Sequence, residues 1–424
     1  MDKAMKLAPG TPLAIGLLTD QNAPARSVGR LAMAAGLAQL EWSADVIAKG
    51  LAISPLRYPA EPGLHPARSR TFDGLHGFLS DCLPDAWGLL LLKRRVQQLG
   101  HRFEDLEAVD RLAMVGAKGR GALVFQPETL TGEPSDSIDL DLLADEARHV
   151  LLGEESELDD LLARLGGGSG GARPKVHVAI GADGSLSVGD ELAVTGAGNA
   201  GEEWIVKFAA TNDPADIGPL EEAYARMARA ARIDMAETRL IPSTTGPGHF
   251  ATRRFDRPAP GKRLHMVSLG GALEASPNMP SVDYDGFLKA TLAITHSMAD
   301  VEQAFRRMVF NVLSRNRDDH VRQHAYLMDD RGNWRLAPAF DLTFSNGPGG
   351  EHYMAVHGEG RTITRDHVGK LAKNHGIAPK RVAAAIDDVR GALADWSSYA
   401  RDAGVGVSVA TVTEGLDSVA QQFS

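Results

Sequence analysis

Two carboxylates, Asp318 and Asp341, stand on either side of a hairpin-like pattern. The apolar run His324–Met328 comes first, the turn-forming residues Asp329–Asn333 follow, and a second apolar run covers Trp334–Ala339. Short apolar runs joined by Asp, Gly and Asn are typical of two antiparallel strands. The pattern therefore predicts one acid just before a strand pair and a second acid just after it.

The polar side chains around this hairpin have a spacing that suits phosphoryl transfer from ATP. In a protein kinase, a base Asp is followed by a metal ligand on the same loop, and a second metal-binding Asp comes after a hairpin. Here Asp318 is the candidate base, Gln323 follows it on the same loop, and Asp341 is the later acid. Oxygen ligands of this kind suit Mg²⁺. We therefore expect Asp318 to be catalytic, and Gln323 and Asp341 to bind the metal.

The dipeptide Asp318-Asp319 leaves two interpretations open. One acid could accept the proton of a substrate hydroxyl while the other pairs with Arg315 or Arg317. The alternative is a surface turn with solvated charges, which is the more common place for two adjacent acids. The spacing to the later acid of the hairpin favours the functional interpretation.

A lysine within an apolar strand is the candidate for binding the phosphates of ATP. Lys207 lies in the predicted strand Trp204–Phe208, where a long cationic side chain is out of place unless its ammonium meets an anion. The alternative is a strand-edge lysine that reaches water. Glu221, at the start of a predicted helix, could hold this lysine toward the phosphates, although Glu222 is a close rival and a solvated carboxylate at a helix start is equally ordinary.

The stretch Gly166–Gly171 fits G-x-G-x-x-G, but it follows a predicted helix, Glu155–Leu165, instead of a strand. That order argues against a dinucleotide-binding turn. Backbone amides exposed by small residues could instead cover phosphates, and a flexible linker is an equal alternative. Lys175 could add a second cation near the phosphates or simply end a strand.

The composition is that of a soluble globular protein. The chain has 424 residues, 43% hydrophobic and 24% charged, with a net charge of −10 that argues against nucleic-acid binding by bulk electrostatics. Its single cysteine, Cys82, excludes an internal disulfide and lies in a predicted helix, Phe78–Gln98, where we expect a core position. The sequence has no signal-peptide pattern and no apolar run long enough for a bilayer, so we expect a cytoplasmic protein without membrane contact. Residues 130–137 form the best candidate linker.

Several motifs, taken in order, resemble those of the HipA-type serine/threonine kinases, the toxins of bacterial type II toxin–antitoxin pairs. They are F-L-S-D-C-L-P-D-A-W-G (Phe78–Gly88), G-G-A-R-P-K (Gly170–Lys175), W-I-V-K-F (Trp204–Phe208), R-R-F-D-R (Arg253–Arg257), R-L-H-M (Arg263–Met266), N-R-D-D-H (Asn316–His320) and L-A-P-A-F-D (Leu336–Asp341). Each motif is a weak signal alone, but their common order over most of the chain is specific.

The resemblance implies an α+β fold of the protein-kinase-like HipA type, with two lobes, a small β-rich N-terminal unit and a mainly helical C-terminal lobe. It implies an N-terminal unit at 1–130, an N-lobe region with the glycine loop at 138–260 and a helical lobe with the catalytic loop at 261–424. It further implies Lys207 on the ATP phosphates, Asp318 as the catalytic aspartate and Asp341 on Mg²⁺. The remaining residues expected to contact ATP are Gly168, Ser169, Gly170, Gly171, Lys175, Glu221 and the hinge residues Arg253, Arg254 and Phe255.

The resemblance also implies partners. Family members phosphorylate a protein, in known cases an aminoacyl-tRNA synthetase, and so arrest translation and growth. A separately encoded helix-turn-helix antitoxin, HipB-like, binds the toxin, and the complex represses its own operon. Contact with DNA is therefore expected only through the antitoxin, and ATP and Mg²⁺ are the expected cofactors.

The chain departs from the family pattern at two positions. Gln323 stands where the family usually has Asn, and Ser169 is the only hydroxyl in a loop where family members often carry a self-phosphorylated serine. A longer side chain displaces a metal ligand, and a shift of about 1 Å can cost on the order of 100-fold in rate. This leaves a second hypothesis beside the active kinase, namely a catalytically weak kinase-fold binding module that works through antitoxin binding and operon autorepression.

Overall fold

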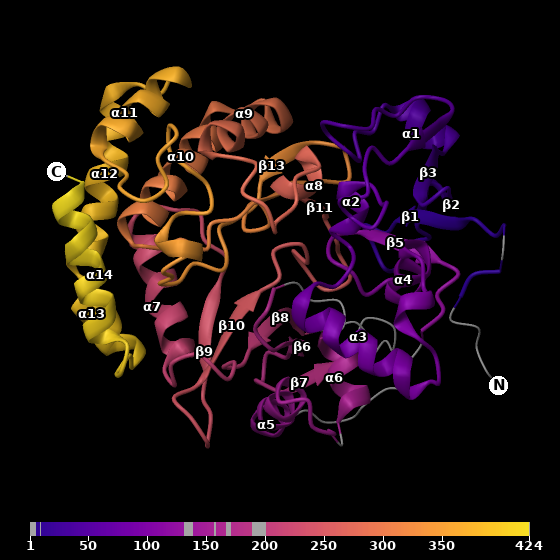
Figure 1. Ribbon diagram of the computed structural model, residues 1–424, viewed down its shortest axis with the longest axis horizontal. Helices are drawn as coiled ribbons and strands as arrows, with labels where there is room; N and C mark the ends of the chain where they lie inside the picture. Colours follow the sequence, from indigo (N-terminus) through magenta and orange to yellow (C-terminus); the bar gives the residue numbers. More distant parts are fainter. Residues whose placement is uncertain are drawn as a thin grey trace. The chain divides into compact units, whose positions relative to one another are not determined.

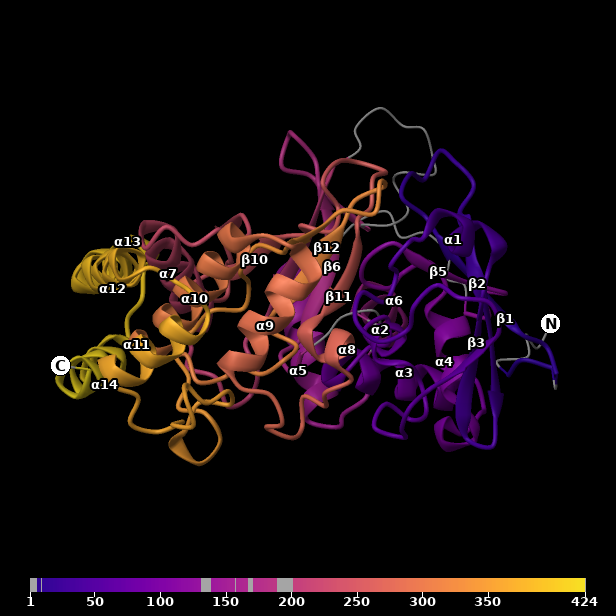
Figure 2. The same cartoon turned by 90° about the horizontal axis from the view of Figure 1, so that it is seen from above.

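The computed structural model describes residues 6–8, 10–130, 139–156, 158–166, 171–188 and 201–423. The chain divides into two compact units, and each is described by itself (Figures 1 and 2). Unit 1 comprises Met1–Thr211, Arg253–Val267 and Leu327–Asn333, and unit 2 comprises Asn212–Thr252, Ser268–Tyr326 and Trp334–Ser424. The three-domain division expected from the sequence stays a prediction. The expected linker at 130–137 falls almost wholly outside the described residues.

Unit 1 contains a five-stranded antiparallel sheet in the order β4-β3-β2-β1-β5. Its strands are β1 (Leu13–Leu17), β2 (Arg26–Ala34), β3 (Leu37–Trp42), β4 (Leu64–Pro66) and β5 (Leu123–Gln126). Alternate residues of β1 are buried, which is the pattern of a sheet with one face on a core. The helices of unit 1 are α1 (Ala44–Lys49), α2 (Gly77–Ser80), α3 (Ala86–Gln98), α4 (Ala108–Val115), α5 (Leu140–Leu151) and α6 (Asp159–Gly166), with a 3₁₀ turn at Phe103–Asp105.

The single helix expected at Phe78–Gln98 is instead two helices, α2 and α3, with Pro84 in the link between them. The residue before a proline is pushed out of the helical conformation, which explains the break. Cys82 lies in this link and is buried, as expected for a core position. Burial raises the pKa of the Cys82 thiol to about 12, so it remains protonated and is a poor nucleophile at neutral pH.

A second group of strands in unit 1 carries the candidate phosphate-binding lysine. It consists of β7 (Leu186–Val188), β6 (Lys175–Ile180) and β8 (Glu202–Lys207), paired antiparallel in that order. The residues Gly181–Gly184 form the turn of the β6–β7 hairpin, in which the amide of Gly184 donates to the carbonyl of Gly181. Every residue of β6 is buried, so this strand lies in the interior of unit 1.

Unit 2 is mainly helical, with α7 (Ile217–Ala230), α8 (Leu269–Leu273), α9 (Tyr284–Thr295), α10 (Met298–Leu313), α11 (Arg365–Asn374), α12 (Pro379–Ala394), α13 (Trp396–Ala403) and α14 (Val409–Gln422). The helices α12, α13 and α14 lie side by side, and α13 packs against α7 (Figures 1 and 2). The remaining elements are β9 (Thr238–Ile241), β10 (His249–Arg253), β11 (His265–Ser268), β12 (Ala325–Met328), β13 (Trp334–Leu336) and a 3₁₀ turn at Pro348–Gly350. The chain crosses from one unit to the other within β11 and β12.

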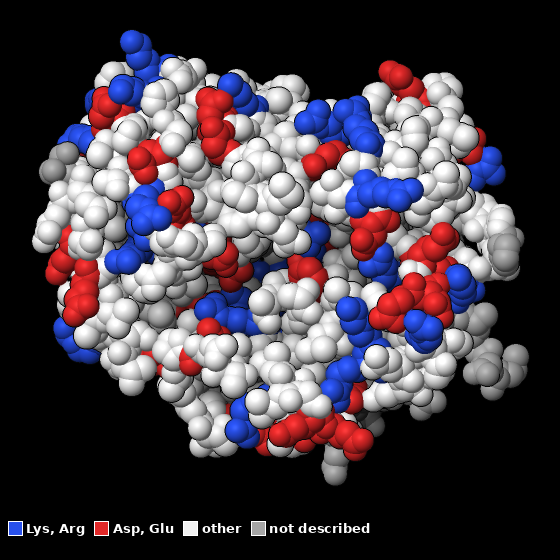
Figure 3. Space-filling view, in the orientation of Figure 1, with Lys and Arg blue, Asp and Glu red and all other residues white. Residues whose placement is uncertain are grey.

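The surface carries charges of both signs. On the face in view in Figure 3, acidic and basic side chains are interspersed over most elements. Within the described ranges, no helix is both long and apolar enough to cross a membrane.

Candidate active site

The catalytic loop of unit 2 brings the two expected metal ligands together. The amide Nε2 of Gln323 donates to Oδ2 of Asp341 at 2.9 Å. The hairpin β12–β13 returns the chain to this point, since the amide of Ala337 donates to the carbonyl of Ala325 at 2.9 Å. Asp341 has a φ of 57°, a left-handed conformation that is uncommon for a residue with a side chain and is often found at functional sites.

The fit of this pair to Mg²⁺ follows from its donor atoms. A carboxylate and an amide on neighbouring segments supply two oxygen ligands, and Mg²⁺ in phosphoryl-transfer sites is held by one or two protein ligands plus phosphates and water. The described part of the chain contains no group of three or more His, Cys, Asp and Glu side chains that could hold a metal. The residues therefore fit Mg²⁺ with substrate phosphates, and they do not fit a closed structural metal site.

Asp318 is the exposed acid of the pair of adjacent aspartates. Its side chain is 55% exposed, and one carboxylate oxygen lies 3.9 Å from Nε2 of His320. A tight turn follows it, in which the amide of Gln323 donates to the carbonyl of His320 at 2.8 Å. An exposed carboxylate on the same loop as Gln323 is accessible to a substrate hydroxyl.

Asp319 is fully buried and has a different set of partners. It accepts hydrogen bonds from the hydroxyl of Tyr284 at 2.6 Å, from Nδ1 of His352 at 2.9 Å and from the amide of Tyr353 at 2.7 Å. Burial alone would raise the pKa of Asp319, but the neighbouring His352 and these hydrogen bonds hold the pKa below its ordinary value. Its partners among the described residues are thus a tyrosine, a histidine and backbone amides, in place of the arginine that the sequence suggested.

A chain of buried hydrogen bonds continues from Asp319 to the helices behind the loop. The hydroxyl of Tyr284 on α9 accepts from Nδ2 of Asn311 on α10 at 2.9 Å. Oδ1 of Asn311 in turn accepts from Nδ2 of Asn316 at 3.0 Å, at the start of the catalytic loop. These residues fix the loop between two helices. Sequence analysis missed Tyr284, His352 and Asn311, because no local pattern marks partners so far away along the chain.

In unit 1 the two candidate phosphate-binding lysines face each other. Lys175 of β6 and Lys207 of β8 are directly opposed in the antiparallel pair, and both are buried, with 6% and 8% of their surface exposed. The structure therefore places the two candidate lysines in one register across β6 and β8. Their contact with phosphates stays a prediction.

The glycine loop is described only at its ends. Gly168, Ser169 and Gly170 lie outside the described residues. Gly171 has a φ of 88°, and a Cβ at this position would lie 2.5 Å from Nζ of Lys175. The left-handed backbone favours glycine here.

The predicted adenine hinge begins a buried ionic cluster in unit 1. Arg254 donates to both oxygens of Asp256, at 3.1 and 2.9 Å, and lies 3.4 Å from Glu203. Arg253 pairs with Glu202 at 3.1 Å, and Phe255 is half-buried in the turn after β10. The contact of these three hinge residues with adenine stays a prediction.

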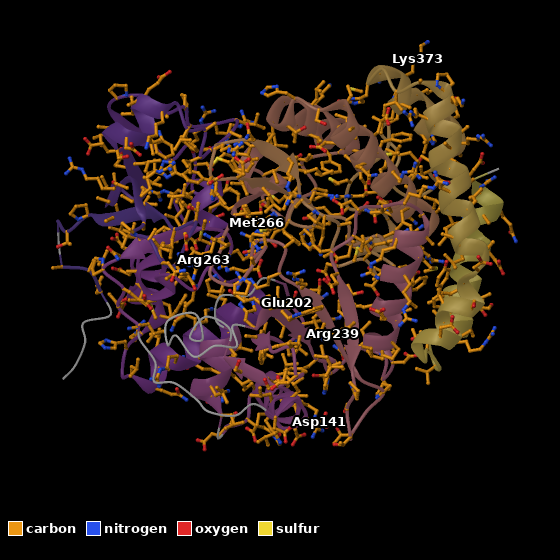
Figure 4. The ribbon with its side chains drawn as sticks, turned by 180° about the vertical axis from the view of Figure 1, so that it is seen from behind. Asp141, Glu202, Arg239, Arg263, Met266 and Lys373 are labelled. Atoms are coloured by element: carbon orange, nitrogen blue, oxygen red, sulfur yellow. The ribbon has the colours of Figure 1, made fainter. Side chains whose placement is uncertain are left out.

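This cluster fastens segment 253–267 to the loop before β5. Nη1 of Arg257 donates to the carbonyl of Gly121 at 2.8 Å, and the amide of Gly121 donates to Asp256 at 2.8 Å. Arg263 donates to the carbonyl of Ala117 at 2.7 Å; Figure 4 labels Arg263 and, three residues later, Met266. Burial would raise the pKa of Asp256, but the charges of Arg254 and Arg257 reverse that effect and lower it well below its usual range.

Two adjacent glutamates on α7 of unit 2 differ in their partners. Glu222 accepts from Nε of Arg226 at 2.7 Å and from the hydroxyl of Thr238 at 2.7 Å. Both oxygens of Glu222 are therefore engaged within unit 2. Glu221 is 2% exposed in the second turn of α7, and not a solvated residue at the start of the helix. The expected pairing of Glu221 with Lys207 stays a prediction.

The candidate residues fall in both units. Lys175, Lys207 and Gly171 belong to unit 1, whereas Asp318, Gln323, Asp341 and Glu221 belong to unit 2. Within unit 2 the structure brings Gln323 and Asp341 together, and within unit 1 it brings the two lysines into register.

Comparison with known proteins gives the same family in both halves of the chain. Residues 167–396 match the HipA-like C-terminal domain, and residues 22–126 match the HipA N-terminal domain. The chain is 29% identical over 169 residues to a protein of Sinorhizobium fredii that is provisionally named kinase Y4dM, and 27% identical over 135 residues to one of Haemophilus influenzae provisionally named a kinase. These alignments cover 36% and 29% of the chain, and they span 40% and 39% of the relatives' length.

The fold is similar to that of a solved HipA chain. This structure, from Shewanella oneidensis, is a complex of a toxin–antitoxin system with HipA, HipB and operator DNA. It matches with a TM-score of 0.68 and 16% identity over 96% of this chain and 95% of the other. The α+β, protein-kinase-like fold of the HipA type is therefore confirmed. Since a family model matches more than half of its length, the chain belongs to the HipA family.

Proposed function

We propose that this protein is a Mg-ATP-dependent serine/threonine protein kinase that acts as a HipA-like toxin. The observation that carries the proposal is the hydrogen-bonded pair of Gln323 and Asp341, 2.9 Å apart, on the same loop system as the exposed Asp318. A reachable carboxylate beside a two-ligand oxygen pair is what transfer of a phosphoryl group to a hydroxyl requires. Family membership supports the same activity.

In this proposal each residue has a defined role. Asp318 orients the acceptor hydroxyl and takes its proton as the γ-phosphoryl group passes to the oxygen and ADP leaves. Lys207 and Lys175 neutralise phosphate charge, Glu221 holds Lys207, and residues 253–255 lie beside adenine. Gln323 and Asp341 hold Mg²⁺, which when bound neutralises charge on the phosphates. Ser169 is the proposed site of self-phosphorylation.

Labelled ATP tests the activity directly. The purified chain is incubated with radiolabelled ATP, Mg²⁺ and a bacterial lysate, and a parallel sample contains EDTA. We expect a labelled lysate protein that is absent with EDTA, and its identity gives the substrate, for which an aminoacyl-tRNA synthetase is the first candidate. No label on any protein, with ATP binding still measurable by calorimetry, contradicts the kinase.

The length of Gln323 favours a second candidate function. Where the family usually has Asn, this side chain is longer by one methylene, which displaces its amide oxygen as a metal ligand. The second candidate is therefore a catalytically weak kinase-fold module that acts through antitoxin binding and operon autorepression.

Gln323→Asn distinguishes the two candidates. The shorter amide cannot make the same contact with Asp341, and it moves the oxygen toward the usual metal position of the family. For the active kinase we expect less than about a threefold change in transfer rate, whereas a weak module should gain on the order of 100-fold, the cost of a ligand misplaced by about 1 Å. Initial transfer rates at saturating ATP check this, with Gln303→Asn, an exchange of an α10 glutamine, as the control.

The proposed partner is a HipB-like helix-turn-helix antitoxin in the cytoplasm, with DNA reached only through it. The net charge of −10 and the mixed charges on the face in view in Figure 3 support this division, since operator binding by phosphate contacts needs basic side chains. Operator binding measured at physiological salt should be tight for the complex and weak for the isolated chain. Tight, specific binding of the operator by the isolated chain would contradict the proposal that DNA is contacted only through the antitoxin.

A further inference from the structure

The motif L-P-D-A-W-G of the N-terminal region contacts the end of the glycine loop. Oδ1 of Asp85 accepts a hydrogen bond from the amide of Gly171. The amide of Trp87 donates to the carbonyl of Gly171 at 3.2 Å, so both polar backbone groups of this glycine are held by one short segment. The indole Nε1 of Trp87 donates to the carbonyl of Lys175 at 3.0 Å.

The same tryptophan also lies against the other end of the loop. A Cβ at Gly166, the last residue of α6, would lie 2.9 Å from Nε1 of Trp87 and 2.8 Å from the carbonyl of Lys175. Trp87 is 1% exposed and is the second residue of α3, which packs against α6. Both ends of the loop are thus fixed against one buried side chain.

The backbone of the motif is adapted to these contacts. Asp85 stands at the N-cap of α3, yet its side chain makes no capping hydrogen bond to that helix. Its carboxylate accepts the hydrogen bond of the Gly171 amide instead. Ala86 has a φ of 33°, a region that an L-residue occupies at a cost and that persists where surrounding contacts hold it. The segment therefore has a strained backbone at Ala86 in the conformation that lets Asp85 bond Gly171.

We infer that Asp85 and Trp87 are positioning residues that hold the C-terminal end of the glycine loop, and with it Lys175, in the geometry that binds phosphates. This inference rests on the proposed function. Gly171 lies against Nζ of Lys175, and Trp87 holds the backbone carbonyl of the same lysine, so the two residues fix both neighbours of this ammonium group. A misplacement of about 1 Å in a positioning group can cost on the order of 100-fold in rate.

Three variants distinguish a role in positioning Gly171 and Lys175 from a role in the stability of the fold alone. Asp85→Ala removes the acceptor of the Gly171 amide, while Asp85→Asn keeps an oxygen in the same place. We expect Asp85→Ala to weaken Mg-ATP binding about 10- to 100-fold and Asp85→Asn to stay within about threefold of wild type. Trp87→Phe keeps a buried ring but loses the bond to Lys175, and we expect a roughly 10-fold loss.

The matched control is Asp139→Ala, which removes an N-cap aspartate from α5 in the same unit. Among the described residues, Asp139 accepts hydrogen bonds from the amides of Asp141 and Leu142 in the first turn of its own helix, so ATP affinity should not change. The measurement is calorimetry with Mg²⁺ and a non-hydrolysable ATP analogue on the full chain. Thermal unfolding of each variant accompanies it.

The outcomes are distinct. Weak binding in Asp85→Ala and Trp87→Phe, with normal binding in Asp85→Asn and Asp139→Ala, supports the inference. Wild-type affinity in Asp85→Ala, or a loss in Asp85→Asn as large as in Asp85→Ala, overturns it while the proposed kinase stands. If the wild-type chain binds no nucleotide and transfers no phosphate, the proposed function fails and takes the inference with it.

Discussion

Replacing Asp318 by Asn should abolish phosphoryl transfer while leaving the fold and ATP binding intact. The side chain is 55% exposed, so its change to an amide of the same shape should alter stability by less than about 0.5 kcal/mol. The amide cannot take the proton of the acceptor hydroxyl. General-base groups contribute roughly 10²- to 10⁴-fold, and we expect a loss of about 10³-fold in transfer rate.

The measurement is the initial rate of label transfer to the acceptor identified in the lysate, together with ATP affinity by calorimetry. Asp366→Asn is the control, because Asp366 is an exposed acid of unit 2 whose partner is Lys370 on the same helix. Near-normal transfer by the Asp318 variant, with the control unchanged, would refute the assignment of the catalytic aspartate.

The same substitution one residue later, Asp319→Asn, should act on stability. The carboxylate accepts from Tyr284, His352 and the Tyr353 amide, whereas an amide has only one acceptor oxygen and turns its NH₂ toward a donor. Breaking a buried, charge-assisted network costs roughly 3–5 kcal/mol. Urea unfolding of this variant and of Asp318→Asn gives a matched pair, and equal stabilities would contradict the network.

The pH dependence of unfolding gives a second test of Asp319. Its pKa is lower in the folded chain than in the unfolded chain, so it stabilises the fold above the unfolded value, about 4. That stabilisation is lost as the pH falls through the lower, folded pKa. Below about pH 5 the stability of the wild type should therefore fall more steeply than that of Asp319→Asn. If stability falls equally with pH in the wild type and in Asp319→Asn, then the pKa of Asp319 is the same in the folded and unfolded chain, which contradicts the prediction.

The hairpin β12–β13 was predictable because its cause is local. Turn-forming residues between two apolar runs specify the strand pair, and the strand pair places Asp341 next to Gln323. The hairpin β6–β7 follows from the same chemistry. By contrast, the sequence predicts one helix at Phe78–Gln98 and not the break between α2 and α3, because a proline near a helix start is tolerated and Pro84 alone does not signal a break.

The partners that bury Asp319 and leave Asp318 exposed could not be predicted. They include Tyr284, 35 residues before Asp319, and His352, 33 residues after it. Neither partner belongs to a local pattern, and burial of one acid is decided by tertiary packing alone. The lysine pair is similar, because each lysine is visible in sequence but their register across β6 and β8 is set by the whole sheet.

The hydrogen bonds of Asp85 and Trp87 to Gly171 predict where inactivating mutations should occur. These two residues lie in the stretch matched by the HipA N-terminal domain, while Gly171 belongs to the C-terminal domain match. If the chain is toxic to its host, mutants selected for survival should carry lesions in both domains, and not only around the catalytic loop. Mutations in the first domain would then inactivate the protein as well. Exchanging this domain between relatives would replace the residues that contact Gly171.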